Sequence, residues 1–367
     1  MRDLLDILAA VREFDDRGKP YAVATVVKVA GSTYRRPGAR MFLSETDTVG
    51  AVSGGCLEND VREHARQVIA SGKPKVVRYD TSFENDTVMG LGIGCDGIIN
   101  VLIERLPAHD DAPVYTDFLA HCLAQNDHGV LATVFASDLP DTLIGSRLIL
   151  QSDGTTTSDI GGATAQAVLA DAGKVMNTHQ SIVAAYEDDR VEVLIEAINP
   201  PLPLLVFGAG HDAMPLVALA AALGWHVTLI DPRTALANTT RFPGAAQIII
   251  CHPDQLSQHL TLSSPAVAVV MTHNYEWDTI IASALLASSI RYVGMLGPKK
   301  RTTRLLNALE DADAIPAGRE DILRFPVGLD IGAETPEEVA LSIIAEIQAV
   351  IRARSAGFLK DRQAAIH

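Results

Sequence analysis

The second half of the chain has a regular order of short apolar runs and amphipathic segments. The runs predict strands at residues 204–207, 226–230, 248–251, 266–271 and 292–296, and the segments between them predict helices at 212–223 and 278–287. Short strands that are apolar on both faces are typical of a parallel sheet covered by helices on both sides. The pattern therefore predicts an α/β fold with a C-terminal Rossmann-like doubly wound parallel sheet.

A long helix is predicted after this sheet, within TPEEVALSIIAEIQAVIRAR. Thr335 and Glu338 have the spacing of a capping box, and Pro336 suits the first helical turn. The apolar stripe of this helix consists of Val339, Ile343, Ile347 and Val350. A stripe of this kind packs against a core, so we assign the helix a structural role.

The first half is less regular. A first helix is followed by a β-branched strand at residues 21–29, a loop that contains GSTYRRPGARM, further short strands and a helix at 57–70. Strands and helices without strict alternation predict an N-terminal α+β domain. Residues 107–198 contain no recognisable chemical motif, and we expect them to extend this domain.

A proline-rich segment, NPPLPLL, separates the two patterns. Prolines restrict the backbone and exclude a central strand or a helix interior. We therefore predict an N-terminal domain of residues 1–198, including the connecting region, and a C-terminal domain of residues 199–367.

Composition narrows the function classes. The chain of 367 residues is 48% hydrophobic and 20% charged, which indicates packed cores rather than disorder. Its net charge of -15 disfavours nucleic acid as a partner. The first helix does not resemble a secretory signal, and no apolar run has the roughly 18 to 20 residues needed to cross a bilayer. We expect a cytoplasmic protein that does not act at a membrane.

The cysteines do not indicate a metal site. Cys56, Cys95, Cys122 and Cys251 lie far apart and form no pair with zinc-ligand spacing. In a reducing compartment each is expected to be a free thiol. Cys56 and Cys95 are distinguished by their glycine-rich surroundings, SGGC and GIGCDG.

The stretch VFGAGHDAMPL is typical of a dinucleotide-binding turn. Gly208 permits a tight turn, Gly210 allows a ligand to approach the backbone, and Ala213 keeps the helix close to the sheet. Asp231 follows at the end of the next strand, where an acid can bind a ribose hydroxyl. Taken alone, this turn favours a nicotinamide or flavin enzyme over a sheet that uses its glycines only for packing.

Polar residues follow several predicted strands of the same sheet. His211 comes directly after the glycine turn, His273 follows the strand at 266–271, and three cations follow the strand at 292–296, namely Lys299, Lys300 and Arg301. Carboxyl ends of parallel strands share one edge of a sheet, so we expect these side chains to line one crevice. Cations beside a helix N-terminus suit a phosphate or pyrophosphate.

Several motifs together resemble those of a known family. The C-terminal motifs VFGAGHDAMPL, VTLIDPR, VVMTHNYEWD, YVGMLGPKKR and GLDIGAETPEEVALSI, and the N-terminal motifs GSTYRRPGARM, GAVSGGCLENDV and GLGIGCDG, are similar to those of the XdhC/CoxI family. The resemblance implies an accessory protein of molybdenum hydroxylases such as xanthine dehydrogenase. Such a protein binds the molybdenum cofactor, as molybdopterin or its dinucleotide form, protects it during sulfuration and inserts it into the apo-enzyme.

The resemblance also implies partners. The main one is an apo molybdenum hydroxylase of the xanthine dehydrogenase type. The family role is also compatible with a cysteine desulfurase as a second partner and with a homodimeric assembly. A chaperone of this kind has no turnover of its own, so we assign no catalytic residue and no metal-ligand set.

Residues of both halves then become candidate cofactor contacts. Arg35, Arg36 and Arg40 form a cationic cluster in the first half, and the glycine turns of Cys56 and Cys95 can present a soft thiolate to molybdenum or sulfur. Cys56 precedes a predicted helix, whose dipole favours a thiolate, whereas Asp96 disfavours ionisation of Cys95. The C-terminal candidates are Gly208, Gly210, His211, Asp231, Arg233, His273, Lys299, Lys300 and Arg301.

Two other hypotheses remain open from the sequence. An NAD(P)-dependent oxidoreductase would use the Gly208 turn, Asp231 for the ribose and His273 as a proton donor. Arg233 leaves open whether a 2′-hydroxyl or a 2′-phosphate is bound. A purely structural partner would use the glycine turns for packing alone.

Overall fold

The computed structural model describes residues 2–80, 97–106, 115–262, 265–311, 315–316 and 318–363, with the backbone alone at residue 320. The chain forms two compact units, Met1–Pro200 and Pro201–His367. No helix in the described ranges is long and apolar enough to cross a membrane.

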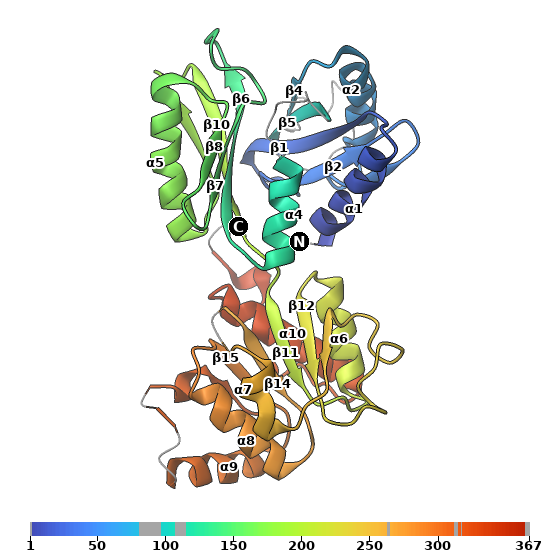
Figure 1. Cartoon of the computed structure of the whole chain (residues 1–367), viewed down its shortest axis with the longest axis vertical. Coiled ribbons are helices and arrows are strands. Elements are labelled where there is room, and N and C mark those ends of the chain that lie inside the picture. The colour runs from blue at the N-terminus through green and yellow to red at the C-terminus, as the bar shows by residue number, and fades with distance from the viewer. Residues whose placement is uncertain are drawn as a thin grey trace. The chain divides into compact units, whose positions relative to one another are not determined.

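The N-terminal unit contains two five-stranded antiparallel sheets (Figure 1). The first has the strand order β3-β2-β1-β5-β4 and the second β8-β7-β6-β10-β9. The elements of the first part are α1 (Arg2–Asp16), β1 (Tyr21–Gly31), β2 (Arg40–Leu43), β3 (Thr48–Gly50), α2 (Glu58–Ser71), β4 (Lys75–Asp80) and β5 (Gly97–Leu106). Those of the second part are α4 (Tyr115–Gln125), β6 (Gly129–Ser137), β7 (Arg147–Gln151), β8 (Thr156–Ser158), α5 (Gly162–Thr178), β9 (Ile182–Tyr186) and β10 (Val191–Ile198).

The two parts repeat one plan. Each has a helix, three strands, a second helix and two strands in chain order, and each sheet has equivalent neighbours. The register agrees in detail, because Thr25 of β1 faces Arg40 of β2 and Thr133 of β6 faces Arg147 of β7. Residues 115–198, which the sequence predicted only to extend the N-terminal domain, thus form a second copy of the first part.

Local backbone features are repeated as well. The N–H of Gly38 donates to Val26, and the N–H of Gly145 donates to Val134 at the equivalent place. Both glycines have a positive φ, and a Cβ on either would approach a glutamate oxygen to within 3.0 Å. Glycine is therefore required in the motifs GAR and GSR, where the backbone passes close to a buried carboxylate.

Two buried ion pairs connect the sheets. Arg40 of β2 pairs with Glu196 of β10, with 2.6 Å between Nη2 and Oε2, and Arg147 of β7 pairs with Glu104 of β5. Each pair joins one sheet to the other, and all four side chains are buried. The ring of Tyr115 lies below both guanidinium groups, 4.1 Å from that of Arg147. The prediction that Arg40 belongs to a cationic cofactor-binding cluster is therefore wrong, because Glu196 neutralises it inside the unit.

Helices cover the outer faces of this pair of sheets. Helix α2 packs on the first sheet through Val61, Ala65 and Val68, and α5 packs on the second through Val168, Ala172 and Val175. The inner faces meet around Val27, Leu102, Phe135 and Leu194. The unit thus has four layers, with the two sheets in the middle.

The C-terminal unit is a doubly wound sheet. Its six parallel strands have the order β13-β12-β11-β14-β15-β16, so the strand order reverses between β11 and β14. The strands are β11 (Pro203–Phe207), β12 (His226–Ile230), β13 (Gln247–Ile249), β14 (Val267–Val270), β15 (Tyr292–Met295) and β16 (Leu323–Arg324). The predicted α/β class, with a Rossmann-like sheet after an N-terminal α+β part, is confirmed.

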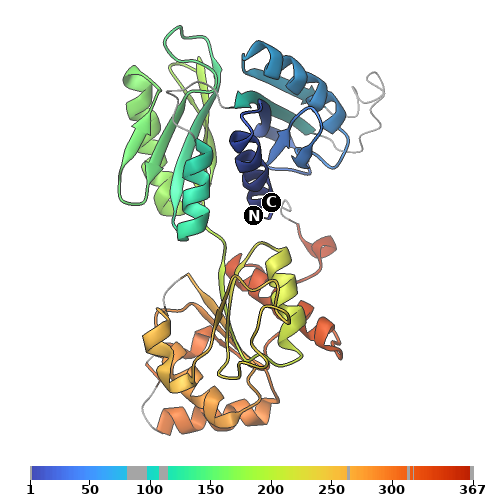
Figure 2. The same ribbon diagram turned by 45° about the vertical axis from the view of Figure 1, so that its right-hand side comes forward.

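Helices cover this sheet on both sides (Figure 2). They are α6 (Ala213–Ala222), α7 (Leu256–His259), α8 (Tyr275–Leu286), α9 (Lys299–Asp311) and α10 (Pro336–Ile351), with 3-10 turns η1 (Pro253–Gln255), η2 (Glu320–Ile322) and η3 (Leu359–Asp361). Helices α6 and α10 share one core with the sheet, and α8 and α9 share the other. The predicted capping box of α10 is present, since Thr335 accepts from the N–H of Glu338 and Glu338 accepts from the N–H of Thr335.

Helix α8 begins earlier than predicted. It starts at Tyr275 and not at Asp278, because the side chain of Asn274 accepts the N–H groups of Glu276 and Trp277. Asn274 is thus the N-cap, a role that its residue type favours and that the predicted start at Asp278 misses. Strand β13 is also shorter than predicted, ending at Ile249.

Candidate functional site

In the glycine turn after β11, the backbone passes close to the backbone that follows β14. Gly208 has φ +116°, and a Cβ there would lie 2.5 Å from the carbonyl oxygen of Met271. A Cβ on Gly210 would lie 2.6 Å from a carboxylate oxygen of Asp212. Ala213, at the third position of the motif, is fully buried at the start of α6. The turn therefore needs Gly208 to fit against the backbone that follows β14, whereas Gly210 meets only side-chain atoms.

The aspartate after β12, Asp231, already has hydrogen-bond partners within the protein. Asp231 is buried, accepts the N–H of Ala209 at 2.7 Å, and forms two hydrogen bonds with the side chain of Arg233, at 2.9 and 2.6 Å. Burial raises the pKa of Asp231, but these hydrogen bonds outweigh it, so the net pKa is lower than usual. Both carboxylate oxygens of Asp231 thus have partners from the protein itself.

The space beside Asp231 is almost filled. The guanidinium of Arg233 lies 5.6 Å from the ring centre of Trp277, and the ring of His252 meets the same tryptophan edge-on. The cavity lined by Asp231, Thr272 and Trp277 holds only about 10 Å³. In doubly wound sheets the adenosine half of a dinucleotide binds beside the acid of the second strand. That half of the crevice is closed in this structure.

A histidine and an aspartate meet where the strand order reverses. Nε2 of His273, after β14, lies 2.7 Å from Oδ2 of Asp212, after β11. His273 is exposed and has φ +60°, a left-handed conformation that is uncommon for a residue with a side chain. Strained residues of this kind often occur at functional sites. His211 is exposed beside them at the start of the same loop.

A second acid lies behind this pair. Asp278 on α8 is buried, accepts the hydroxyl of Thr272 at 2.5 Å and pairs with Arg301, with 2.6 Å between the charged atoms. Burial raises its pKa, although Thr272 and Arg301 act in the opposite direction. Arg301 is therefore an internal partner of Asp278, and a role for it in ligand binding stays a prediction.

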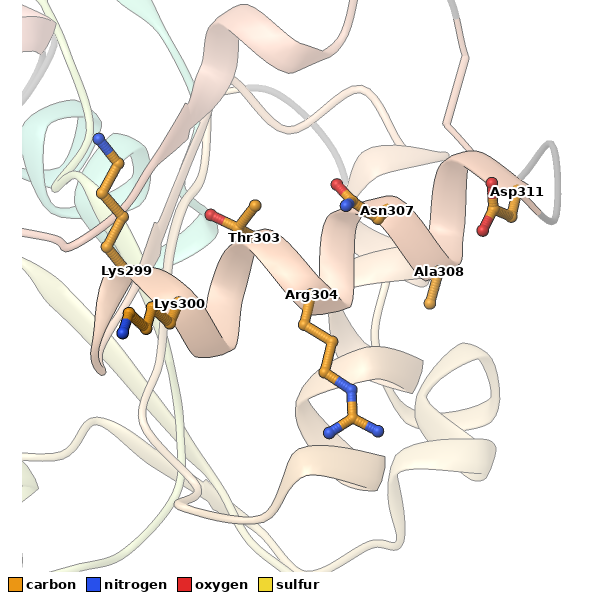
Figure 3. A pocket seen from close by; sticks show the side chains of 7 residues that line it. All are labelled: Lys299, Lys300, Thr303, Arg304, Asn307, Ala308 and Asp311. Carbon is orange, nitrogen blue, oxygen red and sulfur yellow. The ribbon is translucent and has the colours of Figure 1, made fainter.

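The two lysines at the start of α9 are exposed (Figure 3). Lys299 and Lys300 extend in different directions from the first turn of the helix, and Arg304 extends from the next. The same face of α9 lines an open surface hollow. Of the three predicted cations, Lys299 and Lys300 are thus available to an anionic ligand.

In the N-terminal unit, the SGGC loop is braced by its own side chains. The hydroxyl of Ser53 accepts the N–H groups of Gly55, Cys56 and Leu57 at 3.1 to 3.2 Å and donates to Glu58 at 2.6 Å. The carboxylate of Glu58 also accepts the N–H groups of Ser53 and Leu57. These contacts fix the loop between β3 and α2 in one conformation.

Cys56 is presented at the surface of this loop. Its thiol donates to the hydroxyl of Ser53, with 3.4 Å between the two atoms, and the residue is exposed. The N–H of Leu57 at the helix start is directed to Ser53 and Glu58. The side chains of Ser53 and Glu58 thus engage this N–H group, and support of a thiolate by the helix start stays a prediction.

The arginine loop contacts the SGGC loop. Nε of Arg35 donates to the carbonyl of Ala51 at 3.0 Å, and its guanidinium pairs with Asp3. The hydrogen bond from Arg35 lowers the pKa of Asp3. The ring of Tyr34 is 70% exposed and lies against Gly54, where an added Cβ would be 3.8 Å from it.

Arg36 is the free cation of this loop. It is exposed, and no partner for its guanidinium is present in the described ranges of the chain. Arg35 thus fixes the loop, whereas Arg36 remains available. Tyr34, Ser53 and Glu58 were missed in the sequence, although the S-x-x-x-x-E spacing around Cys56 is a readable signal for the bracing pair.

The predicted site residues therefore form separate local groups. Gly208, Gly210, His211 and His273 gather at one sheet edge, Asp231 binds Arg233, and Arg35 contacts the loop of Cys56. Cys95 lies outside the described residues. Within the described residues, no group of three or more histidine, cysteine or carboxylate side chains has the arrangement of a metal site.

These features define a protein with a Rossmann-type unit and a repeated antiparallel unit that presents a braced thiol. Two family models match the chain, one for the XdhC and CoxI family at residues 15–80 and one for the XdhC Rossmann domain at residues 204–347. The chain belongs to the XdhC and CoxI family.

Relatives of the chain extend along most of its length. A Bacillus subtilis protein, whose name makes it a probable xanthine dehydrogenase subunit, is 33% identical over 89% of this chain and 91% of its own. The molybdenum cofactor insertion chaperone PaoD of Escherichia coli is 23% identical over 91% of this chain and 84% of its own. A crystal structure described as a xanthine dehydrogenase from Bacillus halodurans is 27% identical, with a TM-score of 0.77, and covers 97% of this chain and 98% of its own.

Proposed function

We propose that this protein binds the molybdenum cofactor and delivers it to an apo molybdenum hydroxylase of the xanthine dehydrogenase type. The cofactor is the cargo of this process, in the molybdopterin or the dinucleotide form. The names of two relatives, one a molybdenum cofactor insertion chaperone and the other a probable xanthine dehydrogenase subunit, support this class of function. Sulfuration of the bound cofactor, with a cysteine desulfurase as donor, and a homodimeric assembly belong to the same proposal.

The observation that carries the proposal is the exposed thiol of Cys56 on a braced loop. A thiolate is a soft ligand that suits molybdenum or sulfur, and the loop is held by Ser53 and Glu58 without any ligand. Arg36 adds a free positive charge on the neighbouring loop, which Arg35 connects to the SGGC loop. An exposed thiol, on a loop that contacts the loop of a free cation, suits the soft metal and the negative charge of the cargo.

The C-terminal unit has candidate contacts of its own. Lys299 and Lys300 at the start of α9 suit a phosphate, and His211 and His273 lie exposed at the glycine turn. The NAD(P) alternative is less well supported. Asp231 is fully engaged by Arg233 and Ala209, and the adjoining adenosine half of the crevice is closed.

The test uses protein purified from a host that makes molybdopterin. We expect the oxidised extract to contain the fluorescent pterin product, and we expect Cys56→Ser and Arg36→Ala to lower its amount. Cys251→Ser is the matched control, because Cys251 is a buried thiol of the other unit. Equal pterin content in all four proteins would contradict the role of the N-terminal loops, and a lack of pterin in every preparation would contradict the function.

A further inference from the structure

The sheet of the C-terminal unit has a second ligand-sized space, away from the glycine turn. An open recess of about 580 Å³ lies where β15 and β16 end. Its walls are Leu296–Pro298, the loop of residues 326–333, and Val339 and Ser342 of α10. In a sheet of this strand order, this is the half opposite the adenosine site. Its volume is within the range of small-molecule sites, whereas the adenosine half holds about 10 Å³.

The wall of the recess is held in place by buried groups. The buried carboxylate of Glu346 accepts the hydroxyl of Tyr292 at 3.0 Å and the N–H of Gly328. Ser342 donates to the carbonyl of Leu329 at 2.6 Å, and a Cβ on Gly328 would lie 2.4 Å from the Ser342 hydroxyl. The loop is therefore fixed against α10 before any ligand arrives, which lowers the entropic cost of binding.

The lining defines the chemistry of a ligand. Two prolines, Pro298 and Pro326, and the side chain of Leu296 offer apolar surface to a flat ring. Asp330 supplies an exposed carboxylate at the edge of the recess, with no hydrogen bond or ion pair to any part of the chain that the structure describes. A carboxylate accepts two parallel N–H bonds, so it suits a ring edge that carries two adjacent donors.

Two lysines follow one wall of the recess in the chain, although they line a neighbouring surface hollow and not the recess itself. Helix α9, which has 13 residues, begins at Lys299 directly after Pro298, and Lys299 and Lys300 are exposed in its first turn (Figure 3). The positive end of the helix and two lysines favour an anionic group near this wall. The recess thus combines an acceptor for ring donors with a region that favours an anion.

We propose that this recess binds a phosphorylated 2-amino-4-oxopyrimidine ring, with Asp330 facing the amino and ring N–H donors and the phosphate towards the start of α9. Pterins and guanine nucleotides share this ring edge, and adenine lacks it. The proposal deepens the proposed function, on which the choice of the pterin rests, by naming the part of the cargo that the C-terminal unit holds.

The test measures binding of three probes to the full chain by calorimetry: neopterin monophosphate, guanosine 5′-monophosphate and adenosine 5′-monophosphate. We expect saturable binding of neopterin monophosphate and a dissociation constant about tenfold or more higher for the adenine probe, since charge-assisted hydrogen bonds have that magnitude. Tighter binding of the guanine probe would support the site and name a guanine nucleotide as its ligand. Failure of both aminopyrimidinone probes to bind, or equal binding of the adenine probe, would overturn the proposal.

Two variants locate the binding. Asp330→Ala is expected to weaken binding of neopterin monophosphate about tenfold. Glu310→Ala, which removes an exposed carboxylate of α9 outside the recess, is expected to leave it unchanged. Ala333→Phe fills the recess and is expected to abolish binding, with circular dichroism and the melting temperature reporting whether the protein is folded. Unchanged binding in Asp330→Ala would overturn the proposal even if Ala333→Phe failed to fold.

The outcome is separable from that of the proposed function. If purified protein carries molybdopterin and Asp330→Ala retains it fully, cofactor binding stands and this recess is excluded as its place. If neopterin monophosphate binds through Asp330 but the protein never carries molybdopterin, the recess stands and the delivery role fails.

Discussion

At the scale of single residues, the three described cysteines have different surroundings. Cys56 is exposed on a loop held by Ser53, whereas Cys122 and Cys251 are buried in the cores of their units. Burial raises the pKa of Cys122 to about 11, and it also raises the pKa of Cys251. Of these three, only Cys56 is exposed, and its loop contacts the loop that carries Arg36.

This difference predicts selective alkylation of the folded protein. In a Cys95→Ser background at pH 8, iodoacetamide is expected to modify Cys56 first. Cys122 and Cys251 are expected to react only after unfolding, because the thiolate is the reactive form and their pKa values are raised. Peptide mapping by mass spectrometry measures the sites. Modification of Cys122 as fast as Cys56 in the folded state would contradict the assignment.

Asp231 is the residue whose role changed most between sequence and structure. The sequence assigned it to a ribose, but the structure shows it bound to Arg233 and to the N–H of Ala209. The spacing between a glycine turn and an acidic residue predicts only the position of that residue, not its hydrogen-bond partners. Whether it is free depends on the residue two positions later, which the motif does not specify.

The lowered pKa of Asp231 predicts a pH-dependent effect of Asp231→Asn. A carboxylate with a lower pKa in the folded state stabilises the protein above its unfolded pKa of about 3.9, and this contribution is lost as the pH falls through the folded value. Asp231→Asn is therefore expected to lower the free energy of unfolding at pH 7, and the difference should shrink below about pH 4. Urea unfolding at several pH values measures it, with Asp321→Asn at an exposed position as control. A difference that grows as the pH falls would refute this explanation.

At the scale of elements, the repeat of the N-terminal unit explains why residues 107–198 carry no chemical motif. The first copy places the SGGC loop between β3 and α2, where residues 51–57 connect them. The second copy joins β8 and α5 at the equivalent place by residues 159–161 alone. The second copy keeps the sheet and the buried ion pair but has no thiol loop.

The two buried ion pairs between the sheets, Arg40–Glu196 and Arg147–Glu104, predict that a single substitution lowers the stability strongly. Arg147→Ala leaves Glu104 buried without its partner, which is expected to lower the free energy of unfolding by about 3–5 kcal/mol. The double variant Arg147→Met, Glu104→Leu is expected to lose much less, because no buried charge remains. Chemical denaturation measures both values. An equal or larger loss in the double variant would show that the charges themselves stabilise the pairing of the sheets.

Much of the element pattern could be predicted from the sequence. The apolar runs of the C-terminal half predicted the strands because buried parallel strands are apolar on both faces, and Thr335 with Glu338 predicted the start of α10. The repeat was missed although short identical runs mark it, ATV at 24–26 and 132–134 and VLIE at 101–104 and 193–196, because the segments between these runs differ. The burial of Arg40 was missed because its partner, Glu196, lies 156 positions away.

At the scale of the whole molecule, each unit has its own candidate contacts. The N-terminal unit offers a thiol, a free arginine and an exposed tyrosine, and the C-terminal unit offers a recess and two lysines. A nicotinamide dinucleotide would require the closed adenosine half to open.

The small space beside Asp231 predicts weak binding of nicotinamide cofactors. Calorimetry with NADH and NADPH is expected to show no saturable binding at micromolar concentrations, because Arg233 and Trp277 occupy the adenosine half. Trp277→Ala, which opens that half, is the matched variant in which binding is expected to increase. Tight binding of NADH to the unmodified protein would contradict this prediction and support the oxidoreductase hypothesis.

Binding of the molybdenum cofactor is tested most directly by native mass spectrometry. The protein is purified gently under anaerobic conditions from a host that makes the cofactor. We expect a species heavier than the chain by the mass of a molybdenum-bearing pterin, which disappears after heat denaturation. Protein with the mass of the chain alone, which also fails to take up released molybdopterin when the two are mixed, would contradict it.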